Sequence, residues 1–146
     1  MRKLRAIVFD DEEFIVDLFA RYFGAMDYEV MTYTEPLICP IYEKNAEACT
    51  NEHPCADIII TDFRMPRMNG LEVIASQAAR GCKLTARNKA VVSGYLDDES
   101  QVKIKQLGCR IFTKPIDFAE LSDWVAECEK RIDRSRPLGP IRLRVT

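Results

Sequence analysis

The stretch of residues 58–70 constrains the fold of this chain more than any other. It begins with three consecutive isoleucines, a β-branched run that is typical of a strand buried on both faces. The run stops at Asp62, and Pro66 prevents regular secondary structure from continuing. A turn signal follows at Asn69-Gly70, and a helical pattern comes after it. Asp62 is therefore predicted to lie where a core strand leaves the sheet, at the crevice where open α/β sheets bind ligands.

The rest of the chain alternates short strand patterns with helical patterns. Strands are predicted over residues 4–9, 29–33, 57–61, 89–93 and 110–113. Helices are predicted over residues 14–22, 36–48, 71–78, 97–107 and from 118 onward. Gly24 and Gly108 suit helix ends, and Asp117 with Glu120 predicts a capping box. This alternation indicates the α/β class, with a parallel sheet that helices cover on both faces.

Composition excludes several classes of protein. The chain has 146 residues, 47% of them hydrophobic, which suits one packed domain better than a disordered segment. The formal net charge is -2, so no basic surface for nucleic acid is expected. No apolar run approaches the roughly 18 residues of a membrane span, and the amino terminus does not suit a signal peptide. We therefore expect a cytoplasmic protein, with one domain over residues 1–133 and a loose tail over residues 134–146 that is too short for an output domain.

Polar side chains follow or end four of the five predicted strands. The first strand is followed by Asp10 and Asp11, and the third by Asp62. The fourth ends in Ser93, and Lys114 follows the fifth. Because parallel strands bring their carboxyl ends to one edge of the sheet, these side chains are expected to meet there. Carboxylates alone repel one another, and hard oxygen ligands suit Mg²⁺, while a lysine and a hydroxyl could hold a phosphoryl group.

A simpler interpretation exists for each of these residues taken alone. Asp10 or Asp11 could only cap the first helix, and Lys114 could be a solvated surface charge. Agreement among four strand ends is much harder to explain in that way.

Together these residues resemble the receiver domain of two-component response regulators, over roughly residues 3–133. The matching motifs are Asp10-Asp11, Asp62-x-x-Met65-Pro66-x-Met68-Asn69-Gly70, Ser93-Gly94 and Lys114-Pro115. The resemblance implies a flavodoxin-like, doubly wound sheet with strand order 2-1-3-4-5. It also implies a phosphorylation-dependent signalling switch that catalyses only its own phosphorylation and dephosphorylation, and a cis peptide bond before Pro115.

The resemblance assigns a role to each matching residue. Asp62 would accept the phosphoryl group from a histidine kinase or phosphotransfer protein, and Ser93 and Lys114 would hold that group. The implied Mg²⁺ ligands are Asp10, Asp11, Asp62 and the backbone carbonyl of Arg64. A downstream protein target is also implied, together with a partner or homodimer face built from the fourth helix, fifth strand and fifth helix. Neither nucleic acid nor a membrane is an expected partner.

Three positions affect how the resemblance is carried over. Many receivers have an aromatic residue three positions before the lysine, and here Ile111 stands there, which puts the usual coupling route to the surface in doubt. Arg64 and Tyr95 stand two residues after the acceptor aspartate and the serine. We expect both side chains to flank the pocket and to alter water access to the phosphoryl group.

Six cysteines are many for a cytoplasmic protein. The segment between the second and third predicted strands holds Cys39, Cys49, Cys55 and His53, which is the only histidine. Of the group, Cys49, His53, Cys55 and Cys82 are expected near the amino ends of the strands, away from the aspartates. Such a group could bind Zn²⁺ or form a disulfide, which gives the alternative function of a receiver-like domain with a metal- or redox-sensing role. No Cys-x₂-Cys pair exists, and cysteine is a common small core residue, so packing is the other interpretation.

Other functions fit less well. A Mg²⁺-dependent phosphatase that forms an aspartyl phosphate would need a D-x-D pattern after its first strand, where this chain has Asp10-Asp11-Glu12. A nucleotide-binding enzyme would need a G-x-G-x-x-G or P-loop pattern, and the sequence has neither. A receiver-like adaptor that binds partners without phosphorylation is a further alternative, although all the site residues are intact.

Overall fold

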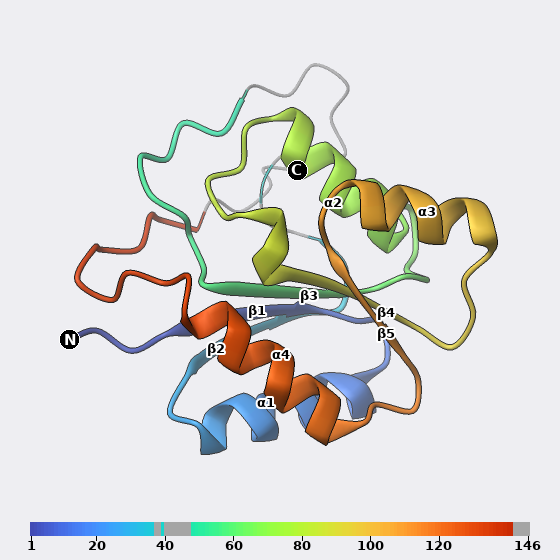
Figure 1. The fold of residues 1–146 in the computed structure, drawn as a ribbon, viewed down its shortest axis with the longest axis horizontal. Helices are drawn as coiled ribbons and strands as arrows, with labels where there is room; N and C mark the ends of the chain where they lie inside the picture. Colours follow the sequence, from blue (N-terminus) through green and yellow to red (C-terminus); the bar gives the residue numbers. More distant parts are fainter. Residues whose placement is uncertain (37–38, 40–47, 142–146) are drawn as a thin grey trace.

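The computed structural model describes residues 1–36, 39 and 48–141 and shows a sheet between two layers of helices (Figure 1). The strands are β1 (Arg5–Phe9), β2 (Glu29–Tyr33), β3 (Ile58–Asp62), β4 (Lys89–Ser93) and β5 (Arg110–Thr113). All pair in parallel, in the order β2-β1-β3-β4-β5. The helices are α1 (Glu13–Ala25), α2 (Gly70–Ala79), the 3₁₀ turn η1 (Ala86–Asn88), α3 (Asp98–Gln106) and α4 (Phe118–Glu129). The predicted fold class and strand order are confirmed.

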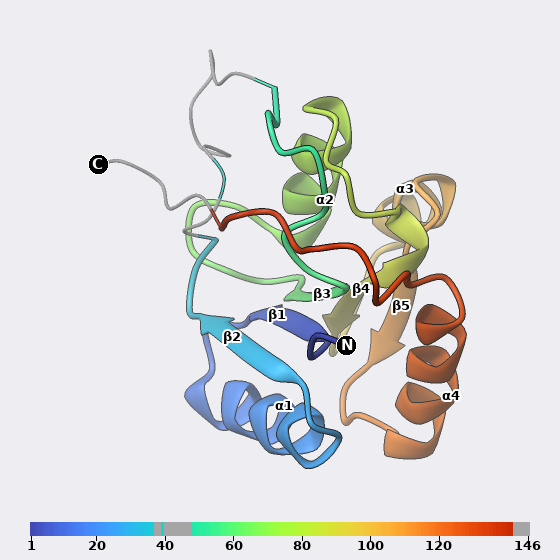
Figure 2. The ribbon, with the colours of Figure 1, turned by 90° about the vertical axis from the view of Figure 1, so that its left-hand side faces the viewer.

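The two faces of β3 build two different parts of the core. Ile58 and Ile60 pack with Phe23 of α1 and Trp124 of α4 on one face. Ile59 points to the other face, where it joins an apolar cluster that includes three partly buried cysteines. Figure 2 shows α1 and α4 below the sheet, and α2 and α3 above it. Because β3 is covered on both sides, its isoleucines are all buried, and each contributes roughly 1.5–3 kcal/mol to folding.

Helix ends differ from the prediction in two places. α1 continues through Gly24, and the left-handed residue that follows the helix is Asp27, with a φ of 63°. Asp117 caps α4 by accepting hydrogen bonds from two backbone N–H groups. The predicted reciprocal half of the capping box is replaced by another contact, because the Glu120 carboxylate accepts a hydrogen bond from the Arg110 guanidinium at 2.7 Å.

The helix predicted over residues 36–48 falls mostly on residues that the structure does not describe. The described residues between β2 and β3 contain no helix.

The expected loose tail is wrong for residues 134–141. The Gly139 N–H donates to the carbonyl of Pro54 at 2.8 Å, and the Asn51 side chain donates to the carbonyl of Pro140 at 2.9 Å. Gly139 permits this approach, because a Cβ there would lie 2.4 Å from the carbonyl oxygen of His53. Figure 2 shows this segment crossing the end of the sheet near the amino terminus. Within the described part of the chain, no helix has the length and apolar character needed to span a bilayer.

Candidate functional site

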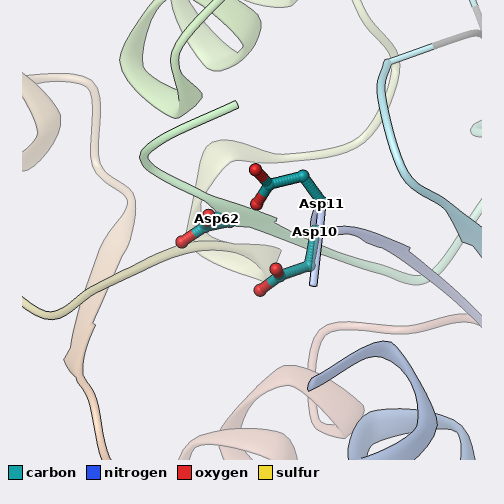
Figure 3. A group of neighbouring side chains, drawn as sticks. All are labelled: Asp10, Asp11 and Asp62. Atoms are coloured by element: carbon teal, nitrogen blue, oxygen red, sulfur yellow. The ribbon is translucent and has the colours of Figure 1, made fainter. Parts of the chain in front are cut away.

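The predicted acidic residues meet at the carboxyl-terminal edge of the sheet. Asp62 is the last residue of β3, while Asp10 and Asp11 directly follow β1, the neighbouring strand. One carboxylate oxygen from each of the three lies within 4.8 Å of the others. Figure 3 shows the side chains of Asp11 and Asp62 converging above Asp10. Asp10 and Asp62 are buried, whereas Asp11 is exposed, so the group opens to solvent on one side.

The ammonium group of Lys114 faces these carboxylates. Lys114 follows β5, and its Nζ lies 3.1 Å from Asp62 Oδ1 and 3.5 Å from Asp10 Oδ2. The same Nζ lies 3.5 Å from Glu12 Oε1. Burial acts to lower the pKa of Lys114, but the neighbouring carboxylates outweigh it and raise that pKa. Lys114 therefore stays charged and is shared among several acids.

The negative charge at this edge is only partly compensated. Burial, followed by repulsion from Asp10, raises the pKa of Asp62 from 3.8 to about 6, although Lys114 opposes the shift. Burial also raises the pKa of Asp10, against a hydrogen bond from the Glu12 N–H. A hard divalent cation would relieve this repulsion, and a set of carboxylate oxygens is the donor chemistry that Mg²⁺ prefers. The residues present therefore fit Mg²⁺.

The simpler capping interpretation does not describe the aspartates. The N-cap residue of α1 is Glu12, and no side chain caps that helix. Asp10 accepts a hydrogen bond from the N–H of Glu12 at 2.9 Å through one carboxylate oxygen, and its other oxygen lies 3.5 Å from Lys114 Nζ. Glu12 is the residue that sequence reasoning missed, although it continues the acidic run after β1.

A cavity of about 460 Å³ opens over the acidic group. Its walls are formed by Asp11, Glu12, Asp62, Arg64, Ser93, Gly94, Tyr95 and Lys114. The expectation that Arg64 and Tyr95 flank this pocket is confirmed, and Tyr95 is 70% exposed at its rim. The Ser93 hydroxyl is buried, donates to the carbonyl of Tyr95 at 2.5 Å and accepts from the Tyr95 N–H at 3.1 Å.

The loop after β3 is held tightly by the segment that sequence analysis interpreted as a turn. Asn69 caps α2 in a reciprocal capping box with Glu72. The N–H of Gly70 donates to the carbonyl of Phe63 at 2.8 Å. A Cβ on Gly70 would lie 2.6 Å from the carbonyl oxygen of Asp62, so the close approach requires glycine. The Asn-Gly pair therefore closes the loop that follows Asp62.

A sequence model of the response regulator receiver domain matches residues 6–126. The chain belongs to this family. Receiver domains are signalling switches of two-component systems, and as a family they bind Mg²⁺ at an acidic pocket and take phosphate from histidine kinases or phosphotransfer proteins. No curated protein matches the chain.

Solved receiver structures share the fold. The receiver domain of an HD domain-containing protein from Pseudomonas fluorescens Pf-5 is 15% identical, with a TM-score of 0.66 and 90% of each chain covered. A receiver domain protein from Clostridium thermocellum is 19% identical with a TM-score of 0.66, covering 88% of this chain and 95% of that one. The receiver domain of the hybrid histidine kinase CckA is 25% identical with a TM-score of 0.57, covering 85% and 97%.

Two details of this receiver domain bear on earlier expectations. The Lys114–Pro115 peptide bond is cis, as predicted. Ile111 is partly buried and packs on an apolar cluster that contains Val91 and Ile104, so it serves the core on that side of β5. An aliphatic side chain there has no hydroxyl or ring with which to follow the state of the site.

Proposed function

We propose that this receiver domain accepts a phosphoryl group on Asp62 and acts as a phosphorylation-dependent signalling switch. The observation that carries the proposal is the partly compensated carboxylate: Asp62 is 5% exposed, has its pKa raised to about 6, and faces an open cavity. Structural carboxylates are normally compensated where they are buried, so this arrangement is costly unless a ligand completes it.

The transfer needs positioning and charge neutralisation more than covalent machinery. A carboxylate oxygen of Asp62 attacks the phosphorus of a phosphohistidine; the P–N bond breaks, and its electron pair leaves with the imidazole, which takes up a proton. Lys114, now 3.1 Å from Asp62, is placed to pair with the incoming phosphoryl oxygens. Ser93 is placed to donate its hydroxyl to the same group after releasing Tyr95.

Mg²⁺ supplies positive charge that offsets the phosphoryl oxygens when it is bound. We assign its binding to Asp10, Asp11 and Asp62, with the backbone carbonyl of Arg64 as a further ligand. In this proposal Arg64 and Tyr95 alter water access, and therefore the lifetime of the aspartyl phosphate.

The proposal includes the partners expected from the sequence. The phosphodonor is a histidine kinase or phosphotransfer protein, and the output is contact with a downstream protein. The surface of α3, β5 and α4 is the proposed partner or homodimer face; Val102 and Phe118 are exposed apolar residues on its two helices. We also propose that residues 1–133 form the receiver unit and that the protein is cytoplasmic. The domain would catalyse only its own phosphorylation and dephosphorylation.

The test compares wild type with Asp62→Asn after incubation with Mg²⁺ and a small acyl phosphate, using intact mass to count phosphoryl groups. We expect one phosphoryl group on the wild type, none on Asp62→Asn, and none on wild type treated with a chelator. Asp123→Asn, which alters an exposed aspartate on α4, is the matched control and should be labelled like wild type. Label on Asp62→Asn, or no label on a folded wild type, would contradict the proposal.

A further inference from the structure

Four cysteines gather at the end of the sheet opposite the acidic site. Cys39, Cys55 and Cys82 pack around one apolar cluster that contains Ile59 of β3. They come from the segment after β2, the segment before β3 and the turn after α2. The fourth, Cys49, is tied to this place because its N–H donates to the carbonyl of Arg80 at 2.8 Å, two residues before Cys82.

The four thiols are close enough to affect one another. Burial raises the pKa of Cys39 to about 12, and the thiols of Cys55, Cys82 and Cys49 add to the shift. Burial likewise raises the pKa of Cys55 to about 11, with Cys82 and Cys49 next in order. All four are free and partly buried. They therefore form a group of neutral thiols whose ionised forms would repel one another unless a cation joined them.

A buried cation beside these thiols is a second, independent observation. Lys89, the first residue of β4, is 3% exposed, and its Nζ donates to the amide oxygen of Gln77 at 2.8 Å. Among the described residues, no carboxylate lies within salt-bridge distance of it. Its charge acts to lower the pKa of Cys39 and Cys55, and also that of Cys109 outside the group. A buried ammonium group without an anion is expensive, and a negatively charged thiolate centre would offset it.

We propose that Cys39, Cys49, Cys55 and Cys82 bind one Zn²⁺ through four thiolates, with Lys89 beside the centre. Binding converts four thiols and one Zn²⁺ into a centre of charge −2 and releases four protons, so one ammonium nearby reduces the net charge. The proposal is independent of phosphorylation, and it implies that the metal joins the β2–β3 connection to the turn after α2.

Zn²⁺ binding requires the thiols to draw closer. Among the described residues, the three aspartates form the group of metal-binding side chains whose atoms lie within 4.8 Å of one another, and no three cysteines are that close. None of the four cysteines lies in a helix or strand, so the loop segments that carry them would have to shift while the sheet stays in place.

A divalent soft metal fits this group better than disulfide chemistry. A thiol whose pKa is raised is protonated at neutral pH and reacts slowly with oxidants, whereas a metal ion displaces the proton directly. Two disulfides would also leave Lys89 without a nearby negative charge.

The test uses the full chain, purified under reducing conditions without chelator. We expect elemental analysis to find about one zinc per chain. After zinc is removed, titration with Co²⁺ should produce the thiolate-to-cobalt charge-transfer and d–d absorption of a tetrahedral four-sulfur site. Cys55→Ala and Cys82→Ala should lose the bound zinc and this absorption.

Matched variants keep the test specific. Cys109→Ala removes a buried thiol outside the group, Cys128→Ala removes one from the opposite face of the sheet, and His53→Ala removes the nearby histidine; all three should retain the metal. Circular dichroism and labelling at Asp62 check that each variant folds. Six freely reactive thiols with neither zinc nor cobalt binding in the folded wild type, a disulfide in their place, or equal metal loss in a control variant would overturn the proposal.

Discussion

Two buried aspartates stand at opposite ends of the same strand. Asp57 directly precedes β3 and is 0% exposed, while Asp62 ends that strand and is 5% exposed. The Asp57 carboxylate accepts two hydrogen bonds from the Arg2 guanidinium, at 2.7 and 2.9 Å, and one from the Arg5 N–H at 2.8 Å. Arg136 adds a second guanidinium at 3.5 Å. Asp62 has one ammonium at 3.1 Å and two neighbouring carboxylates.

The comparison shows that burial alone does not mark a functional carboxylate. Asp57 is surrounded by positive charge and N–H donors, so it holds the amino terminus and the tail against the sheet. Asp62 lies beside the like charges of Asp10 and Asp11, and this repulsion lowers the stability of the folded protein. The two carboxylates differ in how far neighbouring positive charge compensates them. We therefore expect Asp→Asn to have opposite effects on the free energy of unfolding at the two ends of β3.

The largest effect is expected for Asp57→Asn. Removing this charge leaves the Arg2 guanidinium partly buried and unpaired, so the free energy of unfolding should fall by about 3 kcal/mol. Urea denaturation followed by circular dichroism measures it. A loss below about 1 kcal/mol would remove the contrast between the two aspartates.

Asp62→Asn should instead stabilise the protein by about 2 kcal/mol at about pH 7 in Mg²⁺-free buffer, because it removes an unfavourable charge. The pKa of Asp62 is higher in the folded protein than its usual 3.8, so the folded state binds the proton more tightly. The associated stabilisation of wild type is fully present below about pH 4 and is lost as the pH rises through about 6. Denaturation across this range should show the advantage of the variant shrinking toward low pH; a constant difference would contradict it.

A smaller loss is expected for Gly70→Ala. The added Cβ would meet the carbonyl oxygen of Asp62 at 2.6 Å, and the cost of the overlap exceeds the helix-forming advantage of alanine by about 1 kcal/mol. If Asp62 accepts the phosphoryl group as proposed, the rate of phosphorylation should fall as well, because the backbone of Asp62 must shift. Gly24→Ala is the control, since nothing lies within 4 Å of its added Cβ, and it should not lose stability.

The smallest effect is expected for Arg136→Ala. Its contact with Asp57 is 3.5 Å long and Arg2 still compensates the carboxylate, so the loss should be about 0.5 kcal/mol. Amide hydrogen exchange should show faster opening of residues 134–141 with β3 unchanged. A loss as large as that of Asp57→Asn would mean that the tail, rather than Arg2, is the main partner.

The strands were predictable to within one residue because their signals are local. Three consecutive isoleucines in β3 require cover on both faces, and parallel topology then sends Asp10, Asp62 and Lys114 to one edge. The meeting of these side chains could therefore be predicted from the sequence.

The features that were missed depend on residues far apart in the sequence. Arg2 and Asp57 are 55 positions apart, and the tail is held through Gly139 and Pro54. Local pattern also favoured a reciprocal cap by Glu120, whose carboxylate is instead paired with Arg110 of β5. A periodic sequence pattern does not predict such pairs, because each pair forms only when the folded sheet brings distant residues together.

Ser93 makes two hydrogen bonds with the backbone of Tyr95, so the Tyr95 carbonyl competes with any ligand for the Ser93 hydroxyl. A ligand that accepts a hydrogen bond from the Ser93 hydroxyl must replace the carbonyl of Tyr95 as its acceptor. The loop with and without ligand therefore differs by the exchange of one acceptor for another. Removing the hydroxyl would destabilise the loop both when Ser93 contacts Tyr95 and when it contacts a phosphoryl group. The equilibrium between the two loop conformations would therefore change less than expected from losing the phosphoryl contact alone.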